Sequence, residues 1–106
     1  MPDFKNITAT ELQTMLSAGS TTLVDVRTDA EIARGYIKGA TKLPLHLLPM
    51  RLAEFERSAP LVFYCQMGGR SAQAAAFAIN QGYAEVYNLQ GGILAWAQSG
   101  QPLTAD

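Results

Sequence analysis

Residues 61–71 read LVFYCQMGGRS, an apolar run that ends at the only cysteine of the chain and continues into a pair of glycines. The run 61–64 lacks polar alternation, which is typical of a central strand covered on both faces, as in parallel α/β sheets. An alanine-rich stretch follows Ser71 and predicts a helix. Ligands of open parallel sheets bind where the strands end, so Cys65 stands where a functional site is expected.

Cys65 has the sequence surroundings of a reactive thiolate. Gly68 and Gly69 allow the chain to curl and to bring backbone N–H groups towards the sulfur, and the start of the next helix adds the positive end of its dipole. Arg70 adds a nearby cation. Such surroundings lower the pKa of a cysteine. The alternative is a buried, inert cysteine, which would need neither the glycine pair nor the arginine.

The composition predicts one small domain and narrows its partners. With 106 residues, of which 48% are hydrophobic, the chain is expected to form a single packed domain over 1–106. Eight Lys and Arg oppose nine Asp and Glu without a run of one sign, so we expect neither nucleic acid nor a membrane as a partner. The lack of a long apolar segment or a leader favours a cytoplasmic location. One cysteine allows no internal disulfide, and no Cys/His cluster indicates a metal site or other cofactor.

Strands and helices are predicted to alternate along the chain. Thr8 with Glu11 and Thr28 with Glu31 have the spacing of capping boxes, which predict two helix starts, and Gly19 is expected to end the first helix. The expected strands cover 22–26, 41–44, 61–64 and 85–87, and the expected helices cover 8–19, 28–35, 50–57, 72–82 and 93–97. This alternation predicts a three-layer α/β fold with a mainly parallel central sheet flanked by helices.

Two helices in the second half are predicted to bury one face against the sheet. In the helix after the cysteine, the inward residues are expected to be Ala72, Ala75, Ala76 and Ile79. In the last helix, they are expected to be Ile93, Trp96 and Ala97. The small alanine side chains would let the first of these helices lie close to the sheet.

Four separated blocks of sequence occur in a fixed order. They read LVDVR at 23–27 with Glu31, GYIKGA at 35–40 with LP at 43–44, CQMGGRS at 65–71, and GY at 82–83 with Val86, Leu89, Gly91, Gly92 and Trp96. Together they resemble a single-domain rhodanese, of the thiosulfate sulfurtransferase family, over residues 7–102. Two positions depart from that pattern, because Tyr36 replaces the usual histidine and Lys42 stands where asparagine is frequent.

The resemblance implies a central five-stranded parallel sheet and transfer of a sulfane sulfur through a persulfide on Cys65. Thiosulfate or a related donor would supply the sulfur, cyanide or a thiol would accept it, and no cofactor would be needed. The substrate-binding loop would consist of Gln66, Met67, Gly68, Gly69, Arg70 and Ser71. Backbone N–H groups would hold the anionic donor and Arg70 would bind its sulfonate oxygens. For Ser71, we favour a cap of the next helix over a hydroxyl donor to the site.

Two other functions are weighed against this interpretation. A sulfur carrier or interaction module that serves a sulfur-relay partner would use the same loop. A phosphatase or an arsenate reductase is less favoured, because the related phosphatase loop has five residues between cysteine and arginine. Here four residues separate Cys65 from Arg70, Ser71 occupies the place that the arginine would need, and no second cysteine can resolve an intermediate.

The remaining polar residues near predicted strand ends are given structural roles. Asp25 and Arg27, with Glu31 close by, are expected to form an ion-pair network. His46 is the only histidine and has no evident acid partner, so it is expected to be a surface residue and not a general base.

Overall fold

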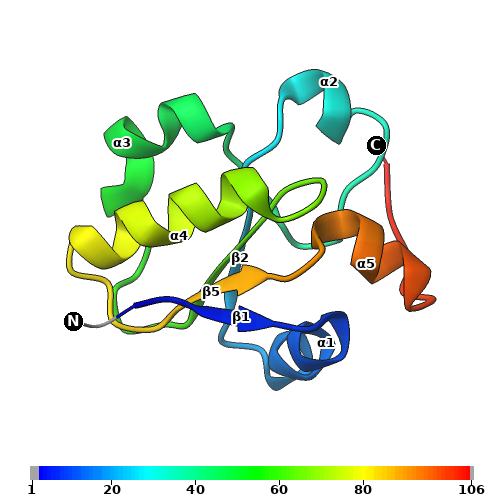
Figure 1. Ribbon diagram of the computed structural model, residues 1–106, viewed down its shortest axis with the longest axis horizontal. Coiled ribbons are helices and arrows are strands. Elements are labelled where there is room, and N and C mark those ends of the chain that lie inside the picture. Colours follow the sequence, from blue (N-terminus) through cyan, green and yellow to red (C-terminus); the bar gives the residue numbers. More distant parts are fainter. Residues whose placement is uncertain (1–2, 106) are drawn as a thin grey trace.

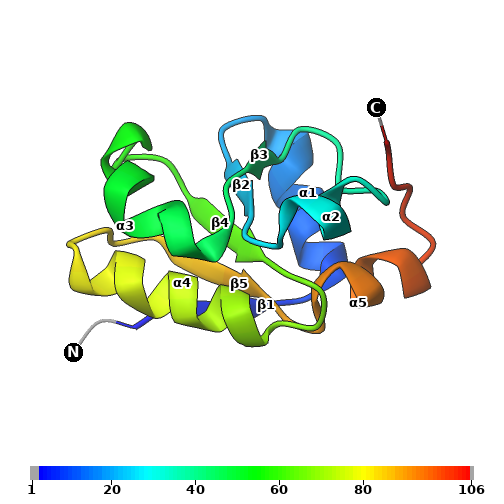
Figure 2. The ribbon, with the colours of Figure 1, turned by 90° about the horizontal axis from the view of Figure 1, so that it is seen from above.

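The computed structural model describes residues 3–105, which form a five-stranded parallel sheet between two layers of helices (Figures 1 and 2). The strands are β1 (Lys5–Ile7), β2 (Thr22–Asp25), β3 (Thr41–Lys42), β4 (Leu61–Tyr64) and β5 (Val86–Leu89), in the order β1-β5-β4-β2-β3. The α-helices are α1 (Ala9–Ala18), α2 (Asp29–Ile32), α3 (Leu48–Arg51), α4 (Gly69–Asn80) and α5 (Gly92–Gln98). This confirms the predicted three-layer α/β fold. Within 3–105, no helix combines the length and the apolar character needed to cross a membrane.

Strand β4 lies at the centre of the sheet and is buried on both faces, as its apolar sequence predicts. Phe63 and Cys65 belong to the core under α3 and α4, whereas Val62 and Tyr64 belong to the core under α1 and α5. Figure 1 shows α3 and α4 on one side of the sheet and α1 on the other. The central position brings the end of β4, and with it Cys65, between elements from both halves of the chain.

Both predicted capping boxes are confirmed. Thr8 Oγ1 accepts from the Glu11 N–H at 3.1 Å, and Glu11 Oε1 accepts from the Thr8 N–H at 2.9 Å. Thr28 and Glu31 make the same reciprocal bonds at the start of α2. These boxes satisfy N–H groups that have no partner within the helix. The second box also holds the Glu31 carboxylate at the strand ends, where the candidate site lies.

Several elements differ from the prediction. Helix α2 ends at Ile32 and not near Gly35, and α4 begins at Gly69 and not after Ser71. Strand β1 was not predicted, because three residues are too few to show an alternating pattern. The helix expected over 50–57 is a shorter α3 between two 3₁₀ turns, η1 (Leu45–Leu47) and η2 (Leu52–Glu54). Pro49 lies in the first turn of α3, where its missing N–H does no harm, so the helical segment starts before this proline and not after it.

The buried faces of the last two helices also need correction. Helix α4 buries Ser71, Ala74, Ala75 and Ala78, so Ala75 is the only predicted inward residue that is fully buried. The face is rotated by one residue because the cysteine loop, and not the apolar pattern, fixes how the helix begins. In α5, Ile93 and Trp96 are buried as predicted, but Ala97 is exposed.

Candidate active site

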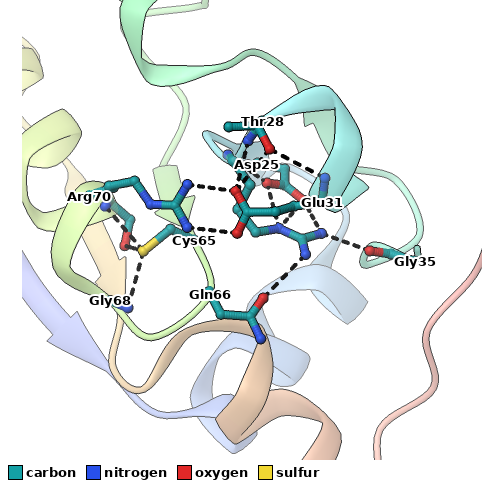
Figure 3. Close-up of polar contacts among 10 residues, drawn as sticks. Asp25, Thr28, Glu31, Gly35, Cys65, Gln66, Gly68 and Arg70 are labelled. Carbon is teal, nitrogen blue, oxygen red and sulfur yellow. Dashed lines mark hydrogen bonds and ion pairs between the residues drawn. The ribbon is translucent and has the colours of Figure 1, made fainter. Parts of the chain in front are cut away.

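The sulfur of Cys65 lies inside a loop that directs hydrogen-bond donors at it. Cys65 follows β4 directly and is only 2% exposed. Its Sγ accepts from the Gly68 N–H at 3.1 Å, the Ser71 N–H at 3.4 Å and the Ser71 hydroxyl at 3.3 Å (Figure 3). The predicted loop thus brings its backbone N–H groups to the cysteine. A sulfur held in this way is surrounded by groups that stabilise negative charge.

The pKa of Cys65 is lowered although the residue is buried. Burial alone raises the pKa, since it disfavours the thiolate, but the hydrogen bonds from the hydroxyl and N–H of Ser71 and from the N–H groups of Gly68 and Met67 outweigh it. The lowering of the Cys65 pKa therefore arises from these hydrogen bonds. The thiolate is the nucleophilic form of cysteine.

Two glycines with positive φ shape this loop. Gly68 is the N-cap of α4 at φ 110°, a conformation that glycine adopts without strain. Gly92 lies at φ 62° against the loop, where an added Cβ would collide with the carbonyl oxygens of Cys65 and Gln66. This close approach lets the Ile93 N–H donate to Cys65 O at 2.9 Å. The start of α5 therefore fixes the cysteine loop from outside.

Ser71 faces the sulfur and does not cap α4, so the favoured capping role was wrong. The N-cap of α4 is Gly68, and no side chain caps this end of the helix. The fully buried Ser71 hydroxyl contacts Cys65 Sγ and also lies 2.5 Å from Asn88 Oδ1. Asn88 Nδ2 in turn donates to Asn6 Oδ1 at 3.0 Å and to Gly68 O at 3.4 Å. Asn88 therefore ties the hydroxyl and the loop to β5 and β1.

Sequence reasoning missed Asn88 and Asn6. One signal was available for Asn88, since it is a polar residue within an otherwise apolar buried strand, and buried polar groups need hydrogen-bond partners. Asn6 lies in the unpredicted strand β1 and gave no such signal.

Arg70 forms a bidentate ion pair with Glu31 (Figure 3). Its Nη1 and Nη2 atoms lie 2.7 and 2.8 Å from the two carboxylate oxygens. The hydrogen bond from Arg70 is the main reason why the pKa of Glu31 falls from its ordinary value of 4.5 to about 2. The pair uses two of the five N–H groups of the guanidinium, so three remain for another anion.

Asp25 and Arg27 form a buried ion pair, as predicted, but Glu31 does not belong to it. Arg27 Nη2 lies 2.7 Å from Asp25 Oδ2 and donates to Gly35 O at 2.7 Å. Glu31 pairs with Arg70 instead, so the network consists of two separate pairs. The Arg27 side chain reaches the loop only through a long contact of 3.5 Å from Nη1 to Gln66 Oε1.

Comparison with known proteins identifies the family. A family model for the rhodanese-like domain matches residues 8–99. The chain belongs to the rhodanese-like family. A sulfurtransferase of Allochromatium vinosum is 52% identical over 83 residues, which cover 78% of each protein. The thiosulfate sulfurtransferase GlpE of Stutzerimonas stutzeri is 40% identical over 96 residues, covering 91% of this chain and 87% of the relative. These names support a sulfurtransferase.

A solved structure supports the same rhodanese-like assignment. The crystal structure of a rhodanese-related protein from Thermoplasma volcanium superposes with a TM-score of 0.89 at 27% identity, covering 97% of this chain and all of the other. The five-stranded sheet that the resemblance implied is thus confirmed by the topology and by this neighbour.

The two departures from the rhodanese pattern lie against each other. Lys42 Nζ sits 4.2 Å from the centre of the Tyr36 ring, a cation–π contact. The tyrosine that replaces the usual histidine thus packs with the lysine that replaces the frequent asparagine. The pair lies between β3 and the turn after α2, and neither residue belongs to the cysteine loop.

Two cavities open beside the loop of this rhodanese-like fold. The larger, of about 340 Å³, includes Arg27, Glu31, Arg34 and Gln66 in its lining. The smaller, of about 280 Å³, is lined by Val26, Thr28, Pro44, Leu45, His46 and Arg70. His46 is exposed, in line with its predicted surface position. Within residues 3–105, no three His, Cys, Asp or Glu side chains are grouped to share a metal ion.

Proposed function

We propose that this protein is a thiosulfate sulfurtransferase that carries sulfur as a persulfide on Cys65. The observation that carries the proposal is the set of three donors within 3.4 Å of Cys65 Sγ. A persulfide places its negative charge on a sulfur next to that position. Donors that stabilise a thiolate there are therefore suited to both anionic states of the cycle.

The proposed reaction has two displacements. In the first, the Cys65 thiolate attacks the outer sulfur of thiosulfate, the sulfur–sulfur bond of the donor breaks, and sulfite leaves with the electron pair. In the second, cyanide or a thiolate attacks the outer sulfur of the persulfide. The bond to Cys65 Sγ then breaks, thiocyanate or a new persulfide leaves, and the Cys65 thiolate is regenerated. Charge is conserved in both steps, and neither needs an external oxidant or reductant.

The loop residues divide the remaining tasks. The N–H groups of residues 66–70 would hold the donor, and the three remaining N–H groups of Arg70 would bind its sulfonate oxygens. Glu31 would keep the guanidinium turned towards the strand ends, because it holds both Nη atoms. Ser71, held by Asn88, would donate to the sulfur in each anionic state.

Mass spectrometry of the intact protein tests the persulfide directly. After incubation with thiosulfate and removal of the donor, we expect one added sulfur atom on Cys65 and its loss as thiocyanate when cyanide is added. Cys65→Ser is nearly isosteric and should keep the fold but gain no sulfur. Sulfur that persists on Cys65→Ser, or wild-type protein that never gains mass, would contradict the mechanism.

A second candidate function is a sulfur carrier for a partner protein. It is favoured by Met67, which is 70% exposed in the loop and offers an apolar contact beside the cysteine. The two functions are separated by turnover. A thiosulfate sulfurtransferase releases many equivalents of thiocyanate from thiosulfate and cyanide. A dedicated carrier is not loaded by thiosulfate, so it releases only the sulfur that its partner has placed on Cys65.

A phosphatase remains less favoured for a geometric reason. The loop closes on Sγ with the Ser71 hydroxyl at 3.3 Å, while the Arg70 guanidinium points to Glu31. A phosphate cradle needs the arginine at the place that Ser71 fills. Lack of release of phosphate from an aryl phosphate would agree with this assignment.

A further inference from the structure

The larger cavity adjoins the loop that carries Cys65. The first turn of α5 forms one wall, and it is joined to the loop by hydrogen bonds from the Ile93 N–H to Cys65 O at 2.9 Å and from the Leu94 N–H to Gln66 O at 3.2 Å. The side chain of Gln66 contributes to the lining itself. A volume of about 340 Å³ suits a small organic molecule. Sulfite and cyanide would fill little of it.

The charged residues of this cavity leave one positive charge without a counterion. Arg27 is paired with Asp25, and Glu31 is paired with Arg70. The Arg34 side chain has no hydrogen bond or ion pair within the part of the chain that the structure describes, residues 3–105, and it is exposed at the rim. The pairs cancel, so Arg34 gives the cavity a net attraction for an anion.

The wall formed by α5 and by Leu103 is apolar and partly open to water. It consists of Ile93, Leu94, Ala97 and Leu103. Leu94 and Leu103 remain 42% and 46% exposed, and they are among the few large hydrophobic side chains on the surface of residues 3–105. Leu103 is held here because the chain after α5 pairs with Tyr36 through Thr104, next to Gly35, and Figure 2 shows this segment running beyond α5. One side of the cavity thus favours hydrocarbon and the other a carboxylate.

We infer that this cavity binds the sulfur acceptor and that the acceptor is a small organic thiol with an apolar body and a carboxylate. The carboxylate pairs with Arg34, the body lies along Leu94 and Leu103, and the thiol points towards Gln66, the residue that follows Cys65 in the loop. This inference rests on the proposed function. The acceptor thiolate attacks the outer sulfur of the persulfide, the bond to Cys65 breaks, the acceptor leaves as a persulfide, and the Cys65 thiolate is restored.

The test compares two acceptors that differ only in charge. With thiosulfate as donor, wild-type protein is expected to use 3-mercaptopropionate with a kcat/KM at least about threefold above that for the neutral 3-mercaptopropionamide, when both are compared at equal thiolate concentration. Arg34→Gln should remove this preference by lowering only the value for the carboxylate. Its rates with cyanide and its dependence on thiosulfate should stay as in the wild type.

Lys5→Gln is the matched control. Lys5 is exposed at the start of β1, whereas the candidate site lies at the carboxyl ends of the parallel strands. The variant therefore loses the same charge far from the cavity. It should keep the preference for the carboxylate. An equal loss in Lys5→Gln and Arg34→Gln, or a preference that survives Arg34→Gln, would overturn the inference, since the effect would then be one of net charge or of another residue.

A binding measurement separates this inference from the proposed function. The thioether 3-(methylthio)propionate cannot accept sulfur, yet it should shift the methyl resonances of Leu94 and Leu103 in wild-type protein and much less in Arg34→Gln. If these shifts occur but no sulfur moves from thiosulfate to cyanide, the proposed function fails and with it the acceptor role. If cyanide accepts sulfur but the thioether shifts neither leucine, the function stands and the acceptor site is refuted.

Discussion

Replacing Ser71 with alanine tests whether hydrogen bonds control the charge of Cys65. The variant removes one donor, the hydroxyl at 3.3 Å from Sγ, and leaves the backbone N–H groups of Ser71 and Gly68 in place at 3.4 and 3.1 Å. Because the lost bond favours the thiolate, its loss raises the pKa of Cys65. At any pH below the midpoint, less of the cysteine is then ionised.

The size of the effect follows from the partners of the hydroxyl. A hydrogen bond to a charged group contributes about 1.5–3 kcal/mol, but Ser71 has a single proton and Asn88 Oδ1 lies only 2.5 Å away. We therefore expect the lower end, which corresponds to about a tenfold smaller thiolate fraction. Leaving Asn88 Oδ1 without its donor should cost about 1–3 kcal/mol of unfolding free energy, within the usual stability of a small domain.

Alkylation by iodoacetamide measures the thiolate. At pH 6, Ser71→Ala should react about tenfold more slowly than wild type, and the two rates should converge at high pH, where both cysteines are ionised. Ser99→Ala is the control, because its hydroxyl donates to Trp96 O at the far end of α5. Equal rates at pH 6 would refute the role of the hydroxyl. A deficit that persists at high pH would mean that access to the sulfur, and not its ionisation, had changed.

Three further predictions concern the ion pair and the glycine next to the loop. The Glu31 pKa of about 2 lies below its ordinary 4.5, so its ionised form stabilises the fold above pH 4.5 and this contribution is lost as the pH falls towards 2. Urea unfolding at both ends of that range should show a loss of unfolding free energy that is about 1 kcal/mol larger in wild type than in Glu31→Gln. The difference is small because the pair is partly exposed. Arg70→Ala should lower kcat/KM for thiosulfate at least about tenfold. Arg51→Ala, whose pair with Glu54 is on the surface, should not lower it. Equal kcat/KM values for the two variants would mean that the backbone alone binds the donor. Gly92→Ala should lose about 2–4 kcal/mol of unfolding free energy, because its Cβ would collide with the loop carbonyls. Gly100→Ala, also at positive φ but in open space, should lose about 1 kcal/mol. Similar losses in the two variants would remove the steric explanation.

The parts of the fold that were predictable depend on local chemistry. The two capping boxes follow from side chains three residues apart, and both helices start where those pairs predict. The central strand β4 follows from an apolar run without alternation, and it lies between β5 and β2. Cys65 was placed correctly for the same reason, since the residue after such a strand must lie at its end. These features need no knowledge of distant contacts.

The features that escaped prediction depend on contacts between distant elements. Ser71 has the residue type of a helix cap, yet it points to the sulfur because the loop begins α4 at Gly68. Once that start is fixed, the buried face of α4 follows from it, and the apolar pattern is off by one residue. Asn88 is 17 residues from Ser71 in the chain, and only the pairing of β5 with β4 brings the two side chains together.

The activation of the sulfur also depends on a contact between distant residues that the sequence does not show. The sequence places Arg70 five residues after Cys65 and predicts a cation next to the thiolate, but the guanidinium forms its short contacts with Glu31. The paired charges cancel in part, whereas the donors at 3.1–3.4 Å from Sγ act directly on the sulfur. Ionisation of Cys65 should therefore depend more on Ser71 than on Arg70, so Arg70→Ala should change alkylation at pH 6 less than Ser71→Ala does. The opposite order would assign the activation to the arginine charge.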